Sequence, residues 1–256
     1  MSCTNPIILV HGIVLKDIKF FKAFGRIERI LKEQGHMVYT AKTDGFGTIE
    51  TNAIQLKAFI EQVLKKHSAE KVNIIAHSKG GLDAKYMIQE LNMHQKVASL
   101  TTLCTPHKGS QIASKILKLP KPIIKITAFW INLIYRIFGD KKPNAYQVCK
   151  ELQSKPVDTL LLSNDIYCQS YSTTLRRSRD DFIMGIPLIF SKHWEKEPSD
   201  GLVSNQSSCF GNYKGDCLEE SISHSEIVDF MVNKRKKEKI YQFYISLCLE
   251  LENMGF

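Results

Sequence analysis

Short apolar runs alternate along the chain with longer stretches whose apolar residues recur at helical spacing. The apolar runs predict strands at residues 6–10, 36–41, 72–76, 97–104 and 185–190. The helical spacing predicts helices at residues 18–31, 51–66, 80–91, 226–232 and 238–251. Strands that alternate with helices are joined by crossover connections. This order therefore predicts an α/β fold with a mostly parallel central sheet flanked by helices.

Polar residues gather where three of the predicted strands end. His11 follows the first strand, Ser78 follows the third, and the turn at residues 104–107 follows the fourth. The carboxyl ends of parallel strands lie along one edge of a sheet, which is where ligands bind in such folds. The sequence therefore predicts a functional site at that edge.

The composition is that of one soluble globular domain over residues 1–256, with 43% apolar and 24% charged residues. The first residues, MSCTNPIILVHG, contain no basic segment followed by an apolar one, so no secretory signal peptide is expected. We therefore expect a cytoplasmic protein whose seven cysteines are reduced. Export by a signal-independent route, with pairing of Cys209 and Cys217, is the alternative.

The segment Ala76–Gly80, which reads AHSKG, joins a predicted strand directly to a predicted helix. A serine nucleophile at such a sharp turn needs small residues two positions before and after it, as in the pattern G-x-S-x-G. Here Ala76 stands at the position of the first glycine, and its side chain adds only one methyl group to the turn. We interpret Ser78 as a nucleophile; the alternative is a serine that caps a helix N-terminus.

A serine nucleophile needs a base and an orienting carboxylate, which follow it in the order acid, then histidine, in hydrolases of this kind. Asp200 and His224 satisfy that order, and His224 is the only histidine after Asp200. Their alternative roles are a turn aspartate before glycine and a residue at a helix start. Backbone N–H groups of Ile13 and Lys79 are expected to form the oxyanion hole.

Four segments resemble, in this order, motifs of the bacterial triacylglycerol lipases of the α/β-hydrolase superfamily: PIILVHG, NIIAHSKGG, LTTLCTPHKGS and SDGLVSNQSS. The resemblance implies an α/β-hydrolase fold with Ser78, Asp200 and His224 as the catalytic triad. It also implies a structural Ca²⁺ site in many members, for which Glu226 and Asp181 or its neighbour Asp180 are the candidates here. Solvated acids without a metal are the alternative, and no other cofactor is implied.

Residues 112–138 form a basic and apolar insertion. Between Lys108 and Lys142 there are eight basic residues and one acidic residue, and the uncharged core, Ile126–Tyr135, is only ten residues long. A transmembrane helix needs about 20 apolar residues, so this segment is not expected to span a bilayer. Ordinary core helices with solvated lysines are one interpretation of the insertion.

The other interpretation is a helical lid at about residues 108–145, because the resembling lipases carry a lid after the corresponding turn. Phe129, Trp130 and Ile134 are the candidate lid and substrate-binding residues, and the charge favours transient contact with an anionic membrane or lipid surface.

The resulting hypothesis is a serine ester hydrolase of lipase type, which cleaves lipid esters such as acylglycerols through an acyl-enzyme. A soluble carboxylesterase, a thioesterase and a phospholipase are the enzymatic alternatives. A lipid-binding module on a degenerate hydrolase fold is the non-enzymatic alternative. Nucleic-acid binding is not expected, because the lysines lie among long apolar side chains and the predicted triad would be left without a role.

Overall fold

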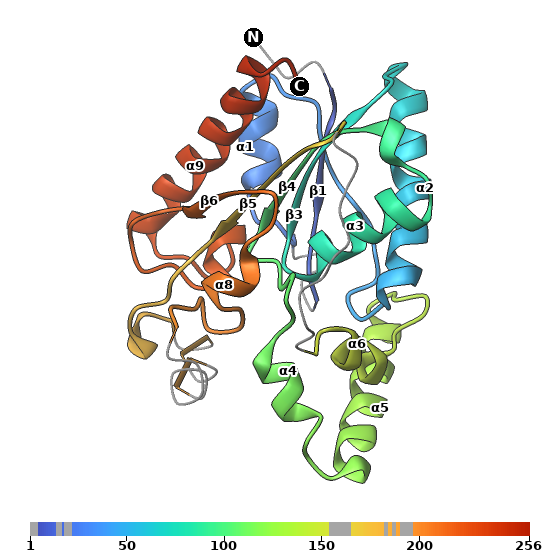
Figure 1. Ribbon diagram of the computed structural model, residues 1–256, viewed down its shortest axis with the longest axis vertical. Coiled ribbons are helices and arrows are strands. Elements are labelled where there is room, and N and C mark those ends of the chain that lie inside the picture. The colour runs from blue at the N-terminus through green and yellow to red at the C-terminus, as the bar shows by residue number, and fades with distance from the viewer. Residues whose placement is uncertain are drawn as a thin grey trace.

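The computed structural model of the protein describes residues 5–13, 17, 22–153, 165–181, 184–185, 188–189 and 197–256. Its centre is one sheet of six parallel strands in the order β2-β1-β3-β4-β5-β6 (Figure 1). The strands are β1 (Ile7–Val10), β2 (Val38–Thr40), β3 (Val72–His77), β4 (Val97–Leu103), β5 (Tyr167–Ser172) and β6 (Asn212–Asp216). The predicted fold class, a parallel sheet flanked by helices, is therefore confirmed.

Helices cover both faces of the sheet. The α-helices are α1 (Ile27–Glu33), α2 (Ile49–His67), α3 (Lys79–Glu90), α4 (Gln111–Ile116), α5 (Lys121–Ile137), α6 (Ala145–Glu151), α8 (Asn205–Ser208) and α9 (Lys234–Asn253). Within the described residues there are also three short 3-10 helices, η1 (His94–Lys96), η2 (Ser178–Asp180) and η3 (Glu226–Val228). Helices α1 and α9 lie on one face, whereas α2 and α3 lie on the other (Figure 1).

The alternation of side chains along β1 explains why both faces are apolar. Ile7 and Leu9 belong to the core under α1 and α9, whereas Ile8 and Val10 belong to the core under α2 and α3. All four are fully buried. A strand covered on both faces has no polar side, which is why this region reads as a continuous apolar run.

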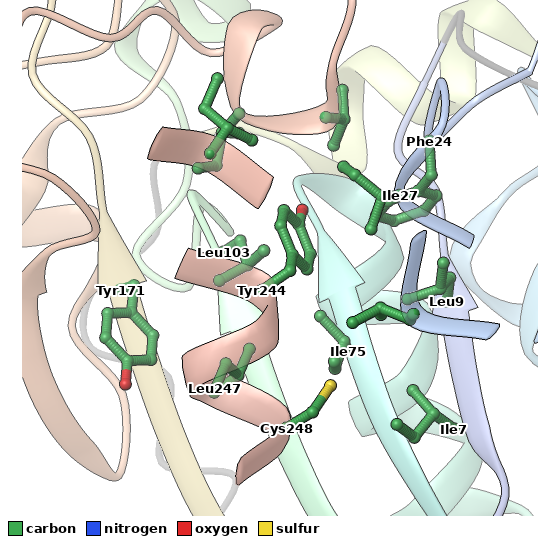
Figure 2. Packing of buried hydrophobic residues seen from close by; sticks show 14 of the residues in the cluster. Ile7, Leu9, Phe24, Ile27, Ile75, Leu103, Tyr171, Tyr244, Leu247 and Cys248 are labelled. Atoms are coloured by element: carbon green, nitrogen blue, oxygen red, sulfur yellow. The ribbon is translucent and has the colours of Figure 1, made fainter. Parts of the chain in front are cut away.

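The C-terminal helix α9 seals the first of these two cores (Figure 2). Tyr244, Leu247 and Cys248 of α9 share one buried cluster with Ile75 of β3 and Leu103 of β4, beside which they lie in Figure 2. Each such apolar side chain contributes about 1.5–3 kcal/mol when it leaves water. This packing fixes α9 to the sheet, and with it the loop that precedes the helix.

Several predicted elements differ in the structure. The strand expected at 185–190 is wrong where the structure describes it, because positions 185, 188 and 189 are helical, while 186, 187 and 190 lie outside the described residues. The helix expected at 18–31 begins only at Ile27, and residues 18–21 lie outside the described residues. The helix expected at 226–232 is only the three-residue η3.

The fifth and sixth strands, β5 and β6, were not predicted, because their sequences, YCQSYS and NYKGD, contain no apolar run. Polar partners on β4 and in the segment just before β6 satisfy the buried side chains of β5 instead. The side-chain amide of Gln169 donates to Thr101 of β4 at 3.1 Å, and the Ser170 hydroxyl donates to the Phe210 carbonyl at 2.7 Å. A hydrophobicity pattern cannot detect a strand that is buried in this way.

Helices α4, α5 and α6 form a separate layer, called here the cap (residues 111–151), beyond the end of the sheet at which β3 and β4 finish (Figure 1). Reciprocal hydrogen bonds tie the cap to the loop after β2. Asp140 accepts from the backbone N–H groups of residues 45–46 at 3.0 and 2.9 Å, and Asp44 accepts from those of residues 141–142 at 3.0 and 2.8 Å. The C-terminal end of α5 is therefore anchored to the sheet.

Candidate active site

Ser78 lies at the junction of β3 and α3, in a backbone conformation that few residues adopt. Its φ is 55° and its ψ is −132°, and Lys79 begins the helix directly after it. A non-glycine residue at positive φ is strained, and such strain is retained mainly at functional sites. The tight turn also requires Gly80, where an added Cβ would come within 2.5 Å of the His11 carbonyl oxygen.

Three side chains from distant parts of the sequence form one hydrogen-bonded chain. The Ser78 Oγ lies 2.8 Å from Nε2 of His224, and Nδ1 of His224 lies 2.6 Å from Oδ2 of Asp200. All three residues are buried. Because a carboxylate only accepts, Nδ1 of His224 carries the proton in this arrangement, and Nε2 is left to accept from the serine hydroxyl.

The Asp200 carboxylate is held by the loop that follows it. Its Oδ1 accepts from the backbone N–H groups of Leu202 and Val203 at 2.9 and 2.8 Å. Its own carbonyl accepts from the backbone N–H of His224 at 3.0 Å. The carboxylate thus has one oxygen for the loop and the other for the imidazole, which fixes the orientation of both groups.

His77 also contacts His224 and was not singled out from the sequence. Its Nε2 donates to the His224 carbonyl at 2.9 Å, and the two rings lie 4.6 Å apart. Burial lowers the pKa of His77 well below its ordinary value, and the neighbouring His224 lowers it further, so His77 is neutral at pH 7. The residue precedes Ser78 in the strand-to-helix turn, which is the only sequence signal that could have identified it.

Glycine 12 brings the loop after β1 into contact with the serine. An added Cβ at Gly12 would lie 2.6 Å from Ser78 Cβ and 3.0 Å from its Oγ. The next residue, Ile13, contributes to the pocket that contains Ser78. The backbone N–H of Lys79 belongs to the first turn of α3, where helix N–H groups have no partner within the helix.

The side chain of Lys79 points away from this chemistry into a buried ion pair. Its ammonium donates to Asp83 at 2.5 Å, and the side-chain amide of Asn52 donates to the same carboxylate at 3.0 Å. Burial raises the pKa of Asp83 to about 6, against the opposing effect of Lys79. The pair therefore holds the Lys79 side chain in the interior, so only the backbone of Lys79 is left to face the site.

An apolar cavity of about 440 Å³ opens onto Ser78 and His224. The cap supplies most of its wall, including Ile124, Ala128 and Ile131 of α5. Such a volume lies within the range of cavities that enclose small-molecule ligands. The shape and lining suit a flexible hydrocarbon chain.

The residues expected to bind substrate in the insertion lie elsewhere. Phe129, Trp130 and Ile134 are 61%, 56% and 45% exposed, and none of them lines the cavity. They occupy the outer face of α5, whereas the cavity wall comes from the opposite face. The sequence pattern located the helix but could not show which of its two apolar faces turns inward.

Cys104 is a further buried group beside the hydrogen-bonded chain. Its sulfur, an Asp200 oxygen and a His224 nitrogen all lie within 4.8 Å of one another. Burial raises the pKa of the Cys104 thiol well above its ordinary value. Metals bind the thiolate form, so a neutral thiol suits a packing role here. Cys209 and Cys217 are also free thiols in the structure.

The two candidate calcium ligands do not fit a Ca²⁺ ion as they stand. Calcium takes six to eight oxygen ligands. Both carboxylate oxygens of Glu226 instead accept from the Lys236 ammonium, at 2.9 and 2.8 Å. Asp181 accepts from the hydroxyls of Ser223 and Ser225 at 2.5 and 3.3 Å. An ammonium occupies the position at which a metal would have to reach Glu226.

Comparison with known proteins identifies the family. The family model of the palmitoyl protein thioesterases matches residues 6–167. Triacylglycerol lipase 2 of Saccharomyces cerevisiae is 27% identical over 259 residues, which cover 90% of this chain and 73% of that protein. A triacylglycerol lipase of Pseudarthrobacter phenanthrenivorans is 41% identical over 115 residues, which cover 42% of this chain and 35% of that protein.

Solved structures agree on the fold. The lipase of Staphylococcus hyicus superposes with a TM-score of 0.70 at 15% identity, over 98% of this chain and 96% of the lipase. A mature lipase of Bacillus licheniformis superposes with a TM-score of 0.66 at 17% identity, over 95% of this chain and 91% of that one. The predicted relation to triacylglycerol lipases is confirmed, and the chain belongs to the palmitoyl protein thioesterase family of α/β-hydrolases.

Proposed function

We propose that this protein is a serine hydrolase that cleaves carboxylic esters of lipids through an acyl-enzyme. One observation carries the proposal: Ser78, His224 and Asp200 are joined by hydrogen bonds of 2.8 and 2.6 Å, at the end of an apolar cavity. In this proposal Ser78 is the nucleophile, His224 is the general base and Asp200 orients the imidazole.

The reaction then follows from the geometry. As Ser78 Oγ attacks the acyl carbonyl, His224 Nε2 takes the serine proton and later gives it to the departing alcohol. Water then attacks the acyl-enzyme, with His224 again as the base, and the carboxylic acid leaves while the Ser78 hydroxyl is restored. Backbone N–H groups of Lys79 and Ile13 are the proposed donors to the oxyanion in both steps.

The substrate class is inferred from the cavity and from the relatives. An apolar wall over most of the cavity favours a fatty acyl chain over a polar acid. The yeast and bacterial relatives are named triacylglycerol lipases, so acylglycerols are the first substrates to test. The match spans only 35% of the bacterial relative. The proposed acyl chain therefore rests on the cavity of this protein, whereas the proposed glycerol head group rests on the names of the relatives.

A second candidate function is the cleavage of long-chain acyl thioesters. The family model that matches residues 6–167 favours it, since that family is named for palmitoyl protein thioesterases. The same three side chains would perform both reactions, because only the leaving group changes from an alcohol to a thiol. Comparing palmitoyl-coenzyme A with a palmitoyl glyceride separates the two functions.

The cap is proposed to act as a lid that also touches the lipid surface. Helix α5 has an inner apolar face on the cavity and an outer one that exposes Phe129, Trp130 and Ile137, the last at 76%. Lys121 and Lys125 of the same helix are exposed and would complement anionic head groups. Among the described residues, no helix is long and apolar enough to cross a membrane.

The anchored end of α5 limits how such a lid could move. Asp44 and Asp140 hold the C-terminal end of the helix to the sheet, whereas residues 117–120 form only a short link between α4 and α5. We therefore expect opening to pivot at the anchored C-terminal end of α5, so that the link at 117–120 moves and the Asp140 contacts stay intact.

Hydrolysis of p-nitrophenyl esters from acetate to palmitate, by the wild type and by Ser78→Ala, tests the proposal. Activity that rises with chain length and disappears in the variant supports a lipid ester hydrolase. A preference for acetate that also disappears supports a soluble carboxylesterase. Equal activity in both proteins contradicts the role of Ser78 and favours a lipid-binding module.

A further inference from the structure

The last helix, α9, begins in a way that helix electrostatics disfavours. Its first turn contains the basic run Lys234–Lys237 and no acidic residue. A helix N-terminus carries partial positive charge, so cations there are unfavourable. Within this run Lys236 is only 5% exposed, and burying its ammonium adds a desolvation cost. An arrangement that is unfavourable on two counts indicates a role outside the helix itself.

The buried ammonium of Lys236 is bound by a single carboxylate. Glu226 accepts from it with both oxygens, at 2.9 and 2.8 Å, and is itself 3% exposed. Such short bonds between ionised groups are stronger than neutral hydrogen bonds. The pair also joins two elements, because Glu226 lies in η3, two residues after His224, whereas Lys236 is held on α9.

Glu226 in turn holds the residue that precedes His224. Its carboxylate accepts from the backbone N–H of Ser223 at 3.0 Å, and its own backbone N–H donates to the Ser223 hydroxyl at 3.2 Å. The same hydroxyl donates to Asp181 at 2.5 Å. The buried Glu226 and the half-buried Asp181 therefore hold the loop that carries His224, and the ammonium of Lys236 lies against Glu226.

We propose that the Lys236 ammonium is an internal cation that positions His224 through Glu226 and Ser223, so that this loop requires no bound divalent metal. Helix α9 packs against the sheet through Tyr244 and Leu247, so the ammonium has a rigid support. Lys236 and Glu226 are positioning residues in this scheme, since neither would touch the substrate. The inference rests on the proposed role of His224 as the general base.

Thermal unfolding of the wild-type protein tests the metal-free part directly. We expect the same melting temperature in EDTA and in millimolar CaCl₂, because the Lys236 ammonium already neutralises Glu226. A melting temperature that falls in EDTA and recovers with CaCl₂ overturns the proposal. This measurement needs no substrate, so it stands even if the protein hydrolyses no ester and the proposed function fails.

Steady-state kinetics on p-nitrophenyl butyrate test the positioning part. Lys236→Met is expected to lower kcat about tenfold or more with KM nearly unchanged, since small displacements of a catalytic group are costly. The control is Lys234→Met, because Lys234 is an exposed lysine in the same turn. This variant loses the same charge and is expected to keep the wild-type kcat. Lys236→Arg is expected to recover most of the activity.

A double-mutant cycle shows whether Lys236 acts through Glu226. Glu226→Gln and the double variant Glu226→Gln/Lys236→Met are expected to lose about as much kcat as Lys236→Met alone, because the three changes remove one connection. The double variant also leaves no unpaired buried charge, so it is expected to fold even if a single variant does not. Additive losses, or a wild-type kcat in the folded double variant, overturn the proposal.

Discussion

The site at the sheet edge consists of buried polar groups, whereas the cap beside it exposes large apolar side chains. At the sheet edge, Ser78, His224 and Asp200 are buried polar groups whose positions are fixed by hydrogen bonds shorter than 3 Å. In the cap, α5 exposes large apolar side chains on its outer face and is held mainly at one end, by Asp44 and Asp140.

The two regions should therefore respond differently to the substitution of a single residue. Buried polar groups lose their function when a single hydrogen-bonding partner is removed, because nothing else can satisfy or orient them. An exposed apolar face contributes through its total area, so its side chains can be removed one at a time with graded effects.

Replacing Asp200 by asparagine is expected to be the most damaging of the changes considered. The amide can still accept from the loop but cannot hold His224 in the required tautomer, so kcat is expected to fall by about 10⁴-fold. Binding to anionic vesicles, measured by co-sedimentation, is expected to be unchanged because the cap is untouched. A variant that retains kcat would show that Asp200 is not the orienting carboxylate.

Substitution of Gly12 by alanine is expected to cause the next largest loss. The new Cβ would come within 2.6 Å of Ser78 Cβ, so the loop carrying Ile13 would have to shift. Loss of one oxyanion donor lowers kcat by about 10²–10³-fold. KM for p-nitrophenyl butyrate is expected to change little.

Gly139→Ala is the matched control in the cap, because an added Cβ at Gly139 would meet nothing within 4 Å. Because Gly139 also has positive φ, any strain in that control is seen separately in its melting temperature.

The contrast also explains how much could be predicted from the sequence. The turn around Ser78 and the chain order of Ser78, Asp200 and His224 were enough to predict that these three side chains meet, as the structure shows. The strand expected before Asp200 is absent from the described positions there, so the order of the residues mattered more than the surrounding elements. His77 was missed because its role depends on the His224 carbonyl, 147 positions away along the chain. Backbone partners of this kind leave no pattern in residue types.

The cap could be predicted only in outline for a different reason. Apolar residues on both sides of α5 showed that the segment is a helix with lysines around it, but Ile124 and Trp130 look equivalent in a hydrophobicity pattern. Only the packing of α6 and α4 decides that Ile124 faces the cavity and Trp130 faces outward. The unpredicted pairing of Lys236 with Glu226 is of the same kind, since burial selects one lysine from a run of basic residues.

Removal of the outer aromatic groups of α5 is expected to affect membrane binding alone. Phe129→Ser/Trp130→Ser is expected to weaken binding to anionic vesicles by about tenfold or more, since each side chain contributes about 1.5–3 kcal/mol when buried in lipid. Hydrolysis of p-nitrophenyl butyrate in solution is expected to stay within about twofold of the wild type, because neither residue lines the cavity.

Leu249→Ser is the matched control for the cap variant, because Leu249 is 47% exposed on the distant helix α9. It is expected to leave vesicle binding unchanged. Equal loss of binding in the control and in the cap variant would contradict a membrane surface on α5. Loss of binding to neutral and anionic vesicles alike would instead remove the lysines from the explanation.

The smallest expected effect concerns stability at mildly acidic pH, and it arises from a buried histidine in the turn after β4. His107 is buried against Phe210 with Thr102 as its hydrogen-bonding partner, and burial lowers its pKa well below the ordinary value of about 6.5. Below about pH 6.5 the His107 imidazole therefore binds a proton more readily in the unfolded chain than in the folded protein. This group contributes stability above about pH 6.5 that is lost as the pH falls towards its folded pKa.

Urea unfolding of the wild type and of His107→Gln at pH about 7.5 and about 5.5 measures this contribution. The wild type is expected to lose more stability than the variant over that range, up to the limit of about 1.4 kcal/mol that the ordinary pKa of histidine sets. Asp83 acts in the opposite direction, because its pKa, raised to about 6, means that its stability is lost as the pH rises. The difference between the two proteins cancels that effect. Equal pH dependence in both proteins would show that His107 takes up a proton in the folded state. Its buried surroundings would then tolerate a positive charge that they are expected to exclude.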